Sequence, residues 1–386
     1  MSKLSLGAFG TSRKENEFRL PIHPHHFESI APELRQSIFL EDGFGGRFGA
    51  EPEELGDLFA GVRTQQQLFE ECDIILLPKP LAEDLTQMHE GQILWGWPHC
   101  VQDEQLTQIA INRKLTLIAW EAMNLWRPDG TFKLHVFHKN NEVAGYCSVL
   151  HALQLTGLTG QYGKRLRAAV ISFGATARGA VTGLAALGIF DVTVLSQREP
   201  AQVVSPVHSA TILQFEAEDD DPTKLNVISE EGSSPMVEVL AEHDIVVNCV
   251  LQDPDGPYMF VSNDELNLFA PGSLIIDVSC DEGMGFEWAR PTTFTDPTFT
   301  VGGDVHYYGV DHSPSYLWNS ATWEVSEALL SYLPTVMAGA QAWDGDETIK
   351  RAIEIRDGII QNPKILSFQN RSSEYPYEKI ARRCYD

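Results

Sequence analysis

A short turn between two apolar runs, in the middle of the chain, most constrains the fold. Residues 168–171 predict a buried parallel strand because they are small or β-branched and the run is short. A segment of helix-forming composition follows at 175–187, and Gly188 stands where a C-terminal cap belongs. Residues 192–195 predict a second strand. This order of strand, turn, helix and strand predicts a βαβ unit of the dinucleotide-binding kind.

The turn departs in one position from the usual fingerprint, G-x-G-x-x-G/A. Ser172 stands at the first glycine position. Gly174 would let the backbone approach a pyrophosphate, and Ala177 is small enough for close packing of helix on strand. A βαβ unit that binds no nucleotide therefore stays open as an alternative.

The end of the second strand bears on the choice of nucleotide. An NAD-binding unit usually carries Asp or Glu there for the ribose hydroxyls. This chain has Ser196, followed closely by Arg198. A hydroxyl with a guanidinium suits a 2′-phosphate, so we expect NADPH in preference to NADH. A surface arginine without this role is the alternative.

Composition excludes several classes of function. A net charge of −26 over 386 residues argues against a nucleic acid or an anionic membrane as partner. No run of about 18 apolar residues occurs, so we expect a cytoplasmic protein without a membrane segment. The six cysteines lack C-x-x-C spacing, and His23, His25 and His26 lack an acidic or cysteine partner at ligand spacing. We therefore expect neither a disulfide framework nor a metal site.

Three side chains in the N-terminal part are candidates for chemistry. Arg19 closes a charged loop, and a guanidinium can hold a carboxylate with two hydrogen bonds. Lys79 stands between two prolines after the expected strand 73–77, and His99 follows the expected strand 93–95. In α/β proteins, sites form at such strand ends. A solvated arginine or lysine and a satisfied core histidine are the alternatives.

The rest of the chain predicts further alternation of strands and helices, and hence an α/β class with parallel sheets. We expect strands at 244–251, 272–279 and 306–310, and helices at 142–154, 235–243, 320–333 and 348–360. The acidic run 216–221, together with Glu230 and Glu231, predicts a solvated loop. At this length, two domains are the default.

Seven short motifs, in order along the chain, carry a family resemblance. They are Lys14-Glu-Asn16 with Arg19, Gly96-Trp-Pro-His-Cys-Val-Gln102, Ala119-Trp-Glu-Ala-Met123, Asn140-Asn-Glu-Val-Ala-Gly145, Thr176-Ala-Arg-Gly-Ala180, Asp277-Val-Ser-Cys-Asp281 and Val310-Asp-His-Ser-Pro-Ser315. With them the chain resembles the alanine dehydrogenase/transhydrogenase N-terminal superfamily, and within it the N5-(carboxyethyl)ornithine synthases. The last two motifs are also similar to the lysine-forming saccharopine dehydrogenases.

The resemblance implies two Rossmann-like domains, with the nucleotide-binding domain inserted into a discontinuous substrate domain. The implied bounds are 1–145 and 316–386 for the substrate domain, the latter as C-terminal helices, and 146–315 for the NAD(P)-binding domain. Members are homo-oligomers, so a homo-oligomer is expected.

The resemblance also implies roles for single residues. Arg19 would bind the carboxylate of a 2-oxo acid, and Lys79 would bind that carboxylate or polarise the carbonyl. His99 would be the general acid and base, Asp281 would lie near the nicotinamide, and His312 would bind substrate. The implied cofactor-binding residues are Ser172, Gly174, Thr176, Ala177, Arg178, Ser196, Arg198, Val250, Leu251 and Asp281.

The implied activity is that of an opine-type oxidoreductase. Such an enzyme condenses the amine of an amino acid such as ornithine or lysine with a small 2-oxo acid such as pyruvate, then reduces the imine with NADPH or NADH. The alternatives are an alanine dehydrogenase-type enzyme that uses ammonia and a saccharopine dehydrogenase-like enzyme. Alanine dehydrogenases carry Asn-Met-Pro where this chain has His312-Ser-Pro314, and Met-Ser where it has Asn140-Asn141, which favours a larger amine.

Overall fold

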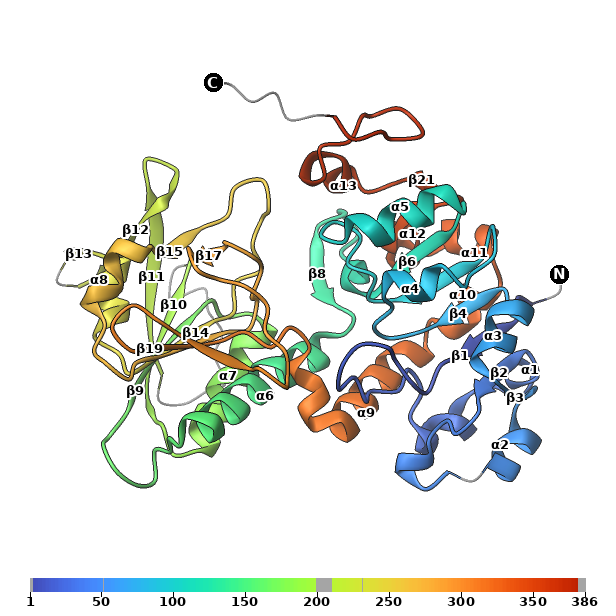
Figure 1. Cartoon of the computed structure of the whole chain (residues 1–386), viewed down its shortest axis with the longest axis horizontal. Helices are drawn as coiled ribbons and strands as arrows, with labels where there is room; N and C mark the ends of the chain where they lie inside the picture. Colours follow the sequence, from blue (N-terminus) through green and yellow to red (C-terminus); the bar gives the residue numbers. More distant parts are fainter. Residues whose placement is uncertain (1–2, 51, 199–209, 231, 381–386) are drawn as a thin grey trace. The chain divides into compact units, whose positions relative to one another are not determined.

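The computed structural model describes residues 3–50, 52–198, 210–230 and 232–380, and the chain divides into two compact units (Figure 1). One comprises Met1–Phe137 with Trp318–Asp386, and the other comprises His138–Leu317. The sequence predicted these breaks after residues 145 and 315. Both units are built on mainly parallel sheets with helices on both faces, which confirms the α/β class.

The first unit contains an eight-stranded sheet in the order β21-β20-β6-β5-β4-β1-β2-β3. Six strands are parallel and two pair in antiparallel fashion. Strands of this sheet come both before and after the second unit in the sequence. The parallel strands are β1 (Leu6–Ala8), β2 (Ile38–Glu41), β3 (Gly61–Arg63), β4 (Ile74–Leu76), β5 (Ile93–Gly96) and β6 (Thr116–Ala119). The antiparallel ones are β20 (Ile353–Arg356) and β21 (Ile359–Ile360).

The predicted helix 348–360 is wrong beyond Ala352, so the C-terminal part of this unit is not helical throughout. Helix α12 (Glu347–Ala352) ends there, and the chain enters the hairpin of β20 and β21. Asp357 and Gly358 form the turn with φ of 51° and 77°. An Asp-Gly pair between alternating residues is a hairpin signal. Helix-forming residues upstream masked it in the sequence.

The sheet of the first unit separates two hydrophobic clusters, as the alternation of side chains in β4 shows. Ile74 and Leu76 lie in one cluster, and Ile75 and Leu77 lie in the other. The first is covered by α9 (Trp318–Leu330), α10 (Leu333–Met337), α11 (Ala340–Gly345) and α12, and the second by α3 (Gln65–Glu71), α4 (Ala82–Leu85), α5 (Glu104–Asn112) and α13 (Pro363–Phe368). The remaining elements are η1 (Pro24–Ser29), α1 (Pro32–Arg35), η2 (Gly46–Phe48), α2 (Pro52–Leu58), η3 (Trp120–Ala122), β7 (Asn124–Trp126) and β8 (Phe132–His135).

The second unit contains a nine-stranded sheet in the order β13-β12-β11-β10-β9-β14-β16-β19-β18. Its six central strands are parallel and follow the order of a dinucleotide-binding fold. They are β11 (Ala210–Glu218), β10 (Asp191–Ser196), β9 (Arg167–Ile171), β14 (Ile245–Asn248), β16 (Leu274–Asp277) and β19 (Val305–Tyr308). Antiparallel strands extend both edges: β12 (Asp221–Ser229), β13 (Gly232–Pro235) and β18 (Thr298–Val301).

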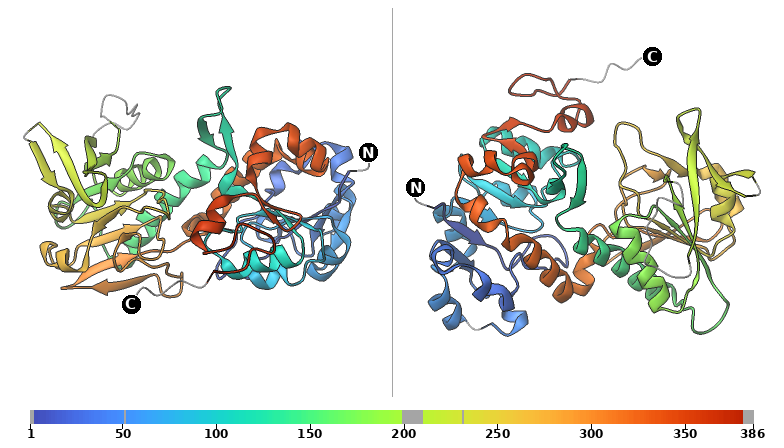
Figure 2. Two further views of the ribbon diagram at one scale, coloured as in Figure 1. Left: turned by 90° about the horizontal axis from the view of Figure 1, so that it is seen from above. Right: turned by 180° about the vertical axis from the view of Figure 1, so that it is seen from behind.

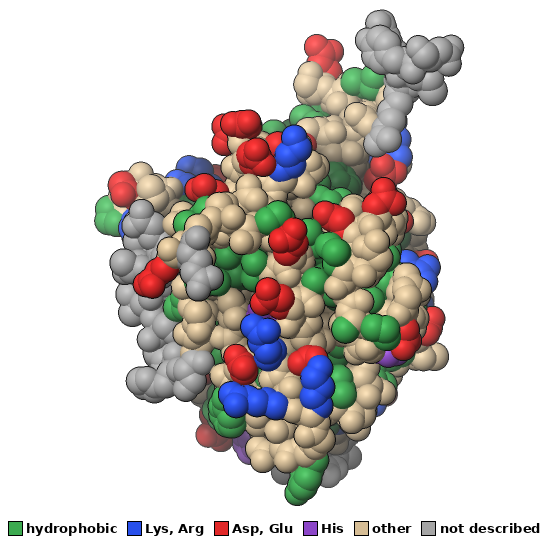
Figure 3. All heavy atoms as spheres, turned by 90° about the vertical axis from the view of Figure 1, so that its left-hand side faces the viewer, with side chains coloured by type: hydrophobic (Ala, Val, Ile, Leu, Met, Phe, Trp, Pro, Cys, Tyr) green, Lys and Arg blue, Asp and Glu red, His purple; other side chains and the backbone are tan. Residues whose placement is uncertain are grey.

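The acidic run 216–221 is therefore not a loop, as the sequence predicted, but the end of a hairpin. Strands β11 and β12 reverse at Asp219 and Asp220, which have φ of 51° and 60°. Phe215, Leu225 and Val227 are buried, while the acidic side chains of β11 alternate outward. Glu231 lies outside the described residues. On the face shown in Figure 3, acidic side chains (red) are spread among hydrophobic ones (green).

Helices α6 (His138–Thr156) and α7 (Ala175–Ala186) run side by side on one face of this sheet (Figure 2). Helix α6 begins at His138, not after Asn141 as predicted. Glycines allow the close contact: a Cβ on Gly145 would lie 1.9 Å from the Thr176 carbonyl oxygen, and one on Gly179 would lie 1.7 Å from that of Glu142. The other elements are α8 (Met236–Ala241), β15 (Met259–Val261), η5 (Asn263–Leu268), β17 (Gly285–Phe286) and η6 (Ser313–Leu317).

None of the described helices has the length and apolar character needed to cross a membrane. Five of the six cysteines lie in the described part of the chain, and each is buried and outside any disulfide. The sixth, Cys384, lies outside the described residues.

Candidate active site

In the first unit, Lys79 and His99 meet at the ends of neighbouring parallel strands. Lys79 follows β4 and His99 follows β5, and the Lys79 Nζ lies 2.8 Å from the His99 Nε2. His99 has a left-handed backbone conformation, with φ of 48°, which residues other than glycine rarely adopt. A strained backbone persists only where the surrounding packing holds it in place, and such residues are concentrated at functional sites. The structure thus brings these two predicted residues together.

Glu121, which the sequence did not single out as a site residue, holds the backbone of His99. It lies in η3, directly after β6. Its Oε1 accepts a hydrogen bond of 2.6 Å from the His99 backbone N–H and lies 3.9 Å from the His99 Nδ1. Burial, followed by the negative charge of Glu354, raises the pKa of Glu121 to about 8. The only available sequence signal was an acid after an apolar strand.

Arg19 is buried and lies in an internal ion pair. Its guanidinium donates to both oxygens of Glu17, with Nε 2.8 Å from Oε1, and its Cζ lies 4.8 Å from the centre of the Trp97 ring. Both side chains are almost fully buried. A substrate carboxylate would therefore meet a guanidinium whose charge is already shared with Glu17, a partner the sequence reasoning missed.

The histidines 23, 25 and 26 form an aromatic cluster with Trp323. The rings of His23 and His26 lie 5.6 Å apart, and His26 Nδ1 lies 2.9 Å from Ser326 Oγ. Burial lowers the pKa of both His23 and His26. Among the described residues, no group of three or more His, Cys, Asp or Glu side chains is arranged to hold a metal ion.

In the second unit, the turn after β9 has a glycine-like backbone at Ser172, the position where the fingerprint's first glycine is missing. Ser172 has φ of 85°, in the left-handed region that glycine favours. Gly174 is exposed and begins α7 without a side-chain cap, so the first N–H groups of the helix are available to an anion. Ala177 is fully buried against the sheet, and the Arg178 guanidinium lies 4.5 Å from the Phe173 ring centre. Thr176 is partly exposed in the first turn of α7.

Ser196 and Arg198 lie at the end of β10, beside this turn. The Ser196 hydroxyl is buried and accepts a hydrogen bond of 3.1 Å from the Arg198 backbone N–H. The exposed Arg198 side chain reaches back to the Phe173 carbonyl oxygen at 3.5 Å. The guanidinium is therefore placed between the end of β10 and the glycine-containing turn.

The ends of β14 and β16 carry the remaining predicted nucleotide residues. Val250 and Leu251 follow β14, and Leu251 is 91% exposed, which is unusual for a leucine. Asp281 follows β16, and burial raises its pKa to about 6. Asp277, fully buried, fixes this loop: it accepts hydrogen bonds from Asn248, the Cys280 N–H and the Tyr307 hydroxyl at 2.8–2.9 Å. An apolar surface and a carboxyl thus lie on neighbouring strands.

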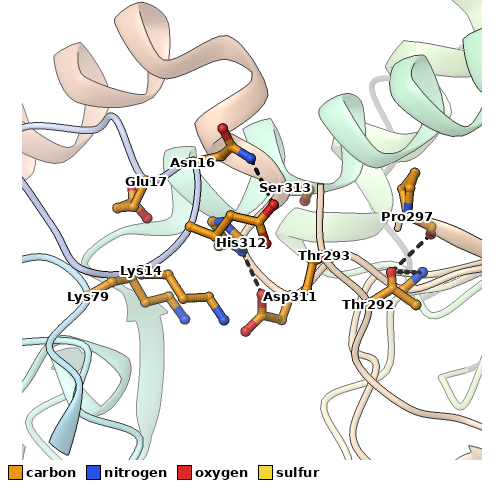
Figure 4. Close-up of polar contacts among 12 residues, drawn as sticks. Lys14, Asn16, Glu17, Lys79, Thr292, Thr293, Pro297, Asp311, His312 and Ser313 are labelled. Carbon is orange, nitrogen blue, oxygen red and sulfur yellow. Dashed lines mark hydrogen bonds and ion pairs between the residues drawn. The ribbon is translucent and has the colours of Figure 1, made fainter. Parts of the chain in front are cut away.

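His312 lies in the same unit, after β19. Its Nδ1 lies 2.6 Å from Asp311 Oδ1 (Figure 4). Its ring makes an edge contact with the Phe294 ring, with the two ring centres 4.9 Å apart. The side chain is only 1% exposed. The carboxylate fixes the orientation of this imidazole.

Comparisons with known proteins agree over both units. Residues 11–144 match the family model described as alanine dehydrogenase/PNT, N-terminal domain, and residues 163–363 match its C-terminal domain. The chain is 24% identical over 329 residues to the N(5)-(carboxyethyl)ornithine synthase of Clostridium botulinum, covering 82% of this chain and 90% of that protein. It is 26% identical over 319 residues to the alanine dehydrogenase of Halomonas elongata, covering 78% and 80%. A solved L-alanine dehydrogenase aligns with a TM-score of 0.71 and 20% identity over 95% of this chain and 99% of that one.

Proposed function

Because the chain belongs to the alanine dehydrogenase/PNT family, we propose that it is an opine-type oxidoreductase. It would condense the amine of an amino acid with a small 2-oxo acid and reduce the imine. Members of the family are NAD(P)-dependent dehydrogenases that act on amino-acid substrates. The observation that carries the proposal is the contact of Lys79 Nζ with His99 Nε2 at 2.8 Å. It puts a cation and a proton carrier at one strand edge, which is what carbonyl activation and loss of water require.

The residues of the first unit would handle the 2-oxo acid. Lys79, as an ammonium, would polarise the carbonyl or hold the carboxylate of the 2-oxo acid. His99 would give a proton to the departing hydroxyl when the imine forms. Arg19 would bind the carboxylate, sharing its charge with Glu17. His312, which lies in the second unit and is oriented by Asp311, is our candidate for contact with the larger amine.

The residues of the second unit fit a nucleotide. The exposed Gly174 and the uncapped start of α7 suit a pyrophosphate, and the exposed Leu251 suits a ring that needs an apolar surface. Bound NAD(P)H supplies the hydride. Arg198, held beside the turn, supports our proposal of NADPH over NADH, because a guanidinium pairs well with a 2′-phosphate.

The proposal is tested by following oxidation of NADPH and NADH by the purified protein. Pyruvate is supplied with ornithine, with lysine or with ammonium, and the products are identified by mass spectrometry. We expect turnover with an amino acid and formation of a secondary amine that contains both carbon skeletons. Turnover with ammonium alone, to give alanine, would overturn the opine proposal and support the alanine dehydrogenase alternative. The similarity to alanine dehydrogenases makes that the second candidate.

A further inference from the structure

The turn that carries His99 is held by the C-terminal part of the same unit. Gln369, the residue directly after α13, is 2% exposed, and its Nε2 donates hydrogen bonds to the carbonyl oxygens of Cys100 at 2.7 Å and Val101 at 3.1 Å. The same Nε2 lies 3.4 Å from the Thr107 Oγ1. Helix α13 lies beside α5, the helix that follows this turn (Figure 1). A side chain 269 residues beyond Cys100 in the sequence thus holds the backbone directly after His99.

A buried arginine fixes the direction in which the Gln369 amide points. Arg371 is 4% exposed, and its Nε donates a hydrogen bond of 2.7 Å to the Gln369 Oε1. Its Nη1 donates to the Gln108 Oε1 at 2.7 Å and to the Tyr377 carbonyl oxygen at 3.2 Å, and its Nη2 donates to the Glu104 carbonyl oxygen at 3.4 Å. Because a guanidinium can only donate, the Gln369 Oε1 faces Arg371, and the amide NH2 group must face the backbone carbonyls.

The backbone on both sides of His99 is held by hydrogen bonds. Its N–H donates to the Glu121 Oε1 at 2.6 Å, and its carbonyl oxygen accepts from the Asp103 N–H at 2.9 Å. The next carbonyl oxygen, that of Cys100, accepts a second hydrogen bond, of 2.7 Å, from the buried Thr107 Oγ1. Because φ of 48° is unfavourable for a histidine, the conformation persists only with such support. Two buried side chains supply that support at the Cys100 carbonyl.

We propose that Gln369 is a positioning residue for His99: it holds the Cys100 carbonyl and so keeps the imidazole Nε2 beside the Lys79 Nζ, at 2.8 Å. The inference rests on the proposed function, in which His99 is the proton carrier. Gln369 touches no reacting atom and acts only through the turn. Without its hydrogen bonds the backbone after His99 can move, and φ can return towards the negative values that a histidine prefers. That change turns the imidazole away from Lys79, because the side chain follows its backbone.

Gln369→Glu tests the proposal with a nearly isosteric change. A carboxylate keeps an acceptor for Arg371, but it has no N–H to donate and it repels the Cys100 carbonyl oxygen. The matched control is Gln108→Glu, which makes the same change beside the same arginine, at a side chain that does not bond to the turn. We expect Gln369→Glu to lower kcat by at least about tenfold, because a misplacement of about 1 Å costs about 100-fold. KM for pyruvate should stay within roughly twofold, because the cations proposed to hold it remain in place. Equal values of kcat in the two variants would overturn the proposal.

Thr107 provides a second variant that acts on the same carbonyl. Thr107→Val removes the other donor to the Cys100 carbonyl oxygen while keeping the shape of the side chain, and it should also lower kcat without raising KM for pyruvate. Thr107→Ser keeps the hydroxyl and should retain the kcat of the wild type. An equal loss in Thr107→Ser and Thr107→Val would make packing the cause and overturn the proposal. Should Gln369→Glu not fold, wild-type kcat in Thr107→Val would overturn it as well.

A further test needs no turnover. Histidine rings labelled with ¹⁵N are observed by NMR in the full-length protein, and the His99 signals are assigned by their loss in His99→Gln. The variant Lys79→Met gives the chemical shifts of a His99 ring without the lysine contact. In Gln369→Glu we expect the His99 signals to move towards those shifts, whereas in Gln108→Glu they should stay at the positions of the wild type.

The NMR result separates the positioning role from the proposed reaction. Unmoved His99 signals in Gln369→Glu would overturn the positioning role even in an active enzyme. Moved signals in a protein that turns over none of the substrates would instead sink the proposed reaction and leave the positioning of His99 by Gln369 established.

Discussion

The two units present different surfaces at the ends of their parallel strands. In the first unit the ends of β4, β5 and β6 carry charged side chains that already contact one another: Lys79, His99 and Glu121. In the second, the corresponding ends carry exposed backbone at Gly174 and exposed apolar surface at Leu251. At these strand ends, the first unit thus presents charged side chains, whereas the second presents exposed backbone and apolar surface. Substitutions at Lys79, His99 or Glu121 should change turnover, and those at Gly174 or Leu251 should change nucleotide binding.

The largest expected effect is that of His99→Gln. Loss of a general acid and base lowers kcat by about 10²–10⁴-fold. NADPH affinity, measured by fluorescence titration, should stay unchanged because the groups proposed to bind the nucleotide lie in the second unit. His89→Gln, an exposed histidine of the first unit, is the control and should change neither value. Wild-type turnover by His99→Gln would remove His99 from the mechanism.

Two glycines of the second unit distinguish the close helix packing that folding needs from the open space that nucleotide binding needs. Gly179→Ala would place a methyl 1.7 Å from the Glu142 carbonyl oxygen, so helices α6 and α7 must separate, and we expect a loss of about 3 kcal/mol in the free energy of unfolding. Gly174→Ala meets only Ser172 Oγ, at 3.9 Å, so its stability should stay within about 0.5 kcal/mol of wild type.

The same Gly174→Ala variant should bind NADPH at least about tenfold more weakly, because its methyl occupies the space of the pyrophosphate. Urea unfolding and fluorescence titration measure the two quantities. Unchanged NADPH affinity would place the pyrophosphate elsewhere and weaken the contrast between the units.

Asp281 is the one predicted acid on the nucleotide side, and its ionisation gives a pH signature. Burial raises its pKa to about 6, so we expect kcat/KM to fall as the pH drops through about 6, and this limb should be absent in Asp281→Asn. The folded protein binds this proton more tightly than the unfolded chain, so the linked stability is present below the unfolded pKa and lost as the pH rises through about 6. Asp281→Asn should therefore gain stability over wild type above pH 6, by urea unfolding. If Asp281→Asn exceeded the wild type in stability by the same amount at low pH, the raised pKa would not belong to Asp281.

The cofactor preference should respond to the end of β10. We expect Ser196→Asp with Arg198→Ala to shift the ratio of NADPH to NADH affinity by about tenfold towards NADH, since a charge-assisted hydrogen bond to a phosphate is lost. Arg165→Ala removes an exposed arginine elsewhere in the unit and is the control. An unchanged ratio would refute the role of Arg198.

Local patterns predicted the framework of the fold, and the family resemblance proposed by the motifs is confirmed. Strands such as β9 and β10 were predictable because a short β-branched run between turns has few other solutions. Strand β20 was missed because helix-forming residues run directly into it. Its hairpin depends on pairing with β6, more than 200 residues away in the chain.

The site could be predicted only where the neighbouring sequence marks a residue as a candidate. Lys79 and His99 stood out because each follows an apolar strand, although no sequence pattern shows that they lie 2.8 Å apart. Glu121 was missed as a functional candidate because its raised pKa comes from burial and from the charge of Glu354, and no sequence pattern shows either. The roles of the predicted site residues stay predictions, and the variants above test them.

Ser172 gives the smallest expected effect and the finest test of the contrast between the units. Its φ of 85° is strained for any residue but glycine, so Ser172→Gly should raise the free energy of unfolding by about 1 kcal/mol. Ser172→Ala keeps the strained backbone but loses the hydroxyl, which makes it the matched control. If both variants bind NADPH like wild type, the turn acts through its shape alone. If both bind more weakly, the hydroxyl contacts the nucleotide, and the second unit also contributes side-chain chemistry. A Ser172→Gly protein no more stable than Ser172→Ala would show that the surrounding structure, not the residue type, compensates the strain of this turn.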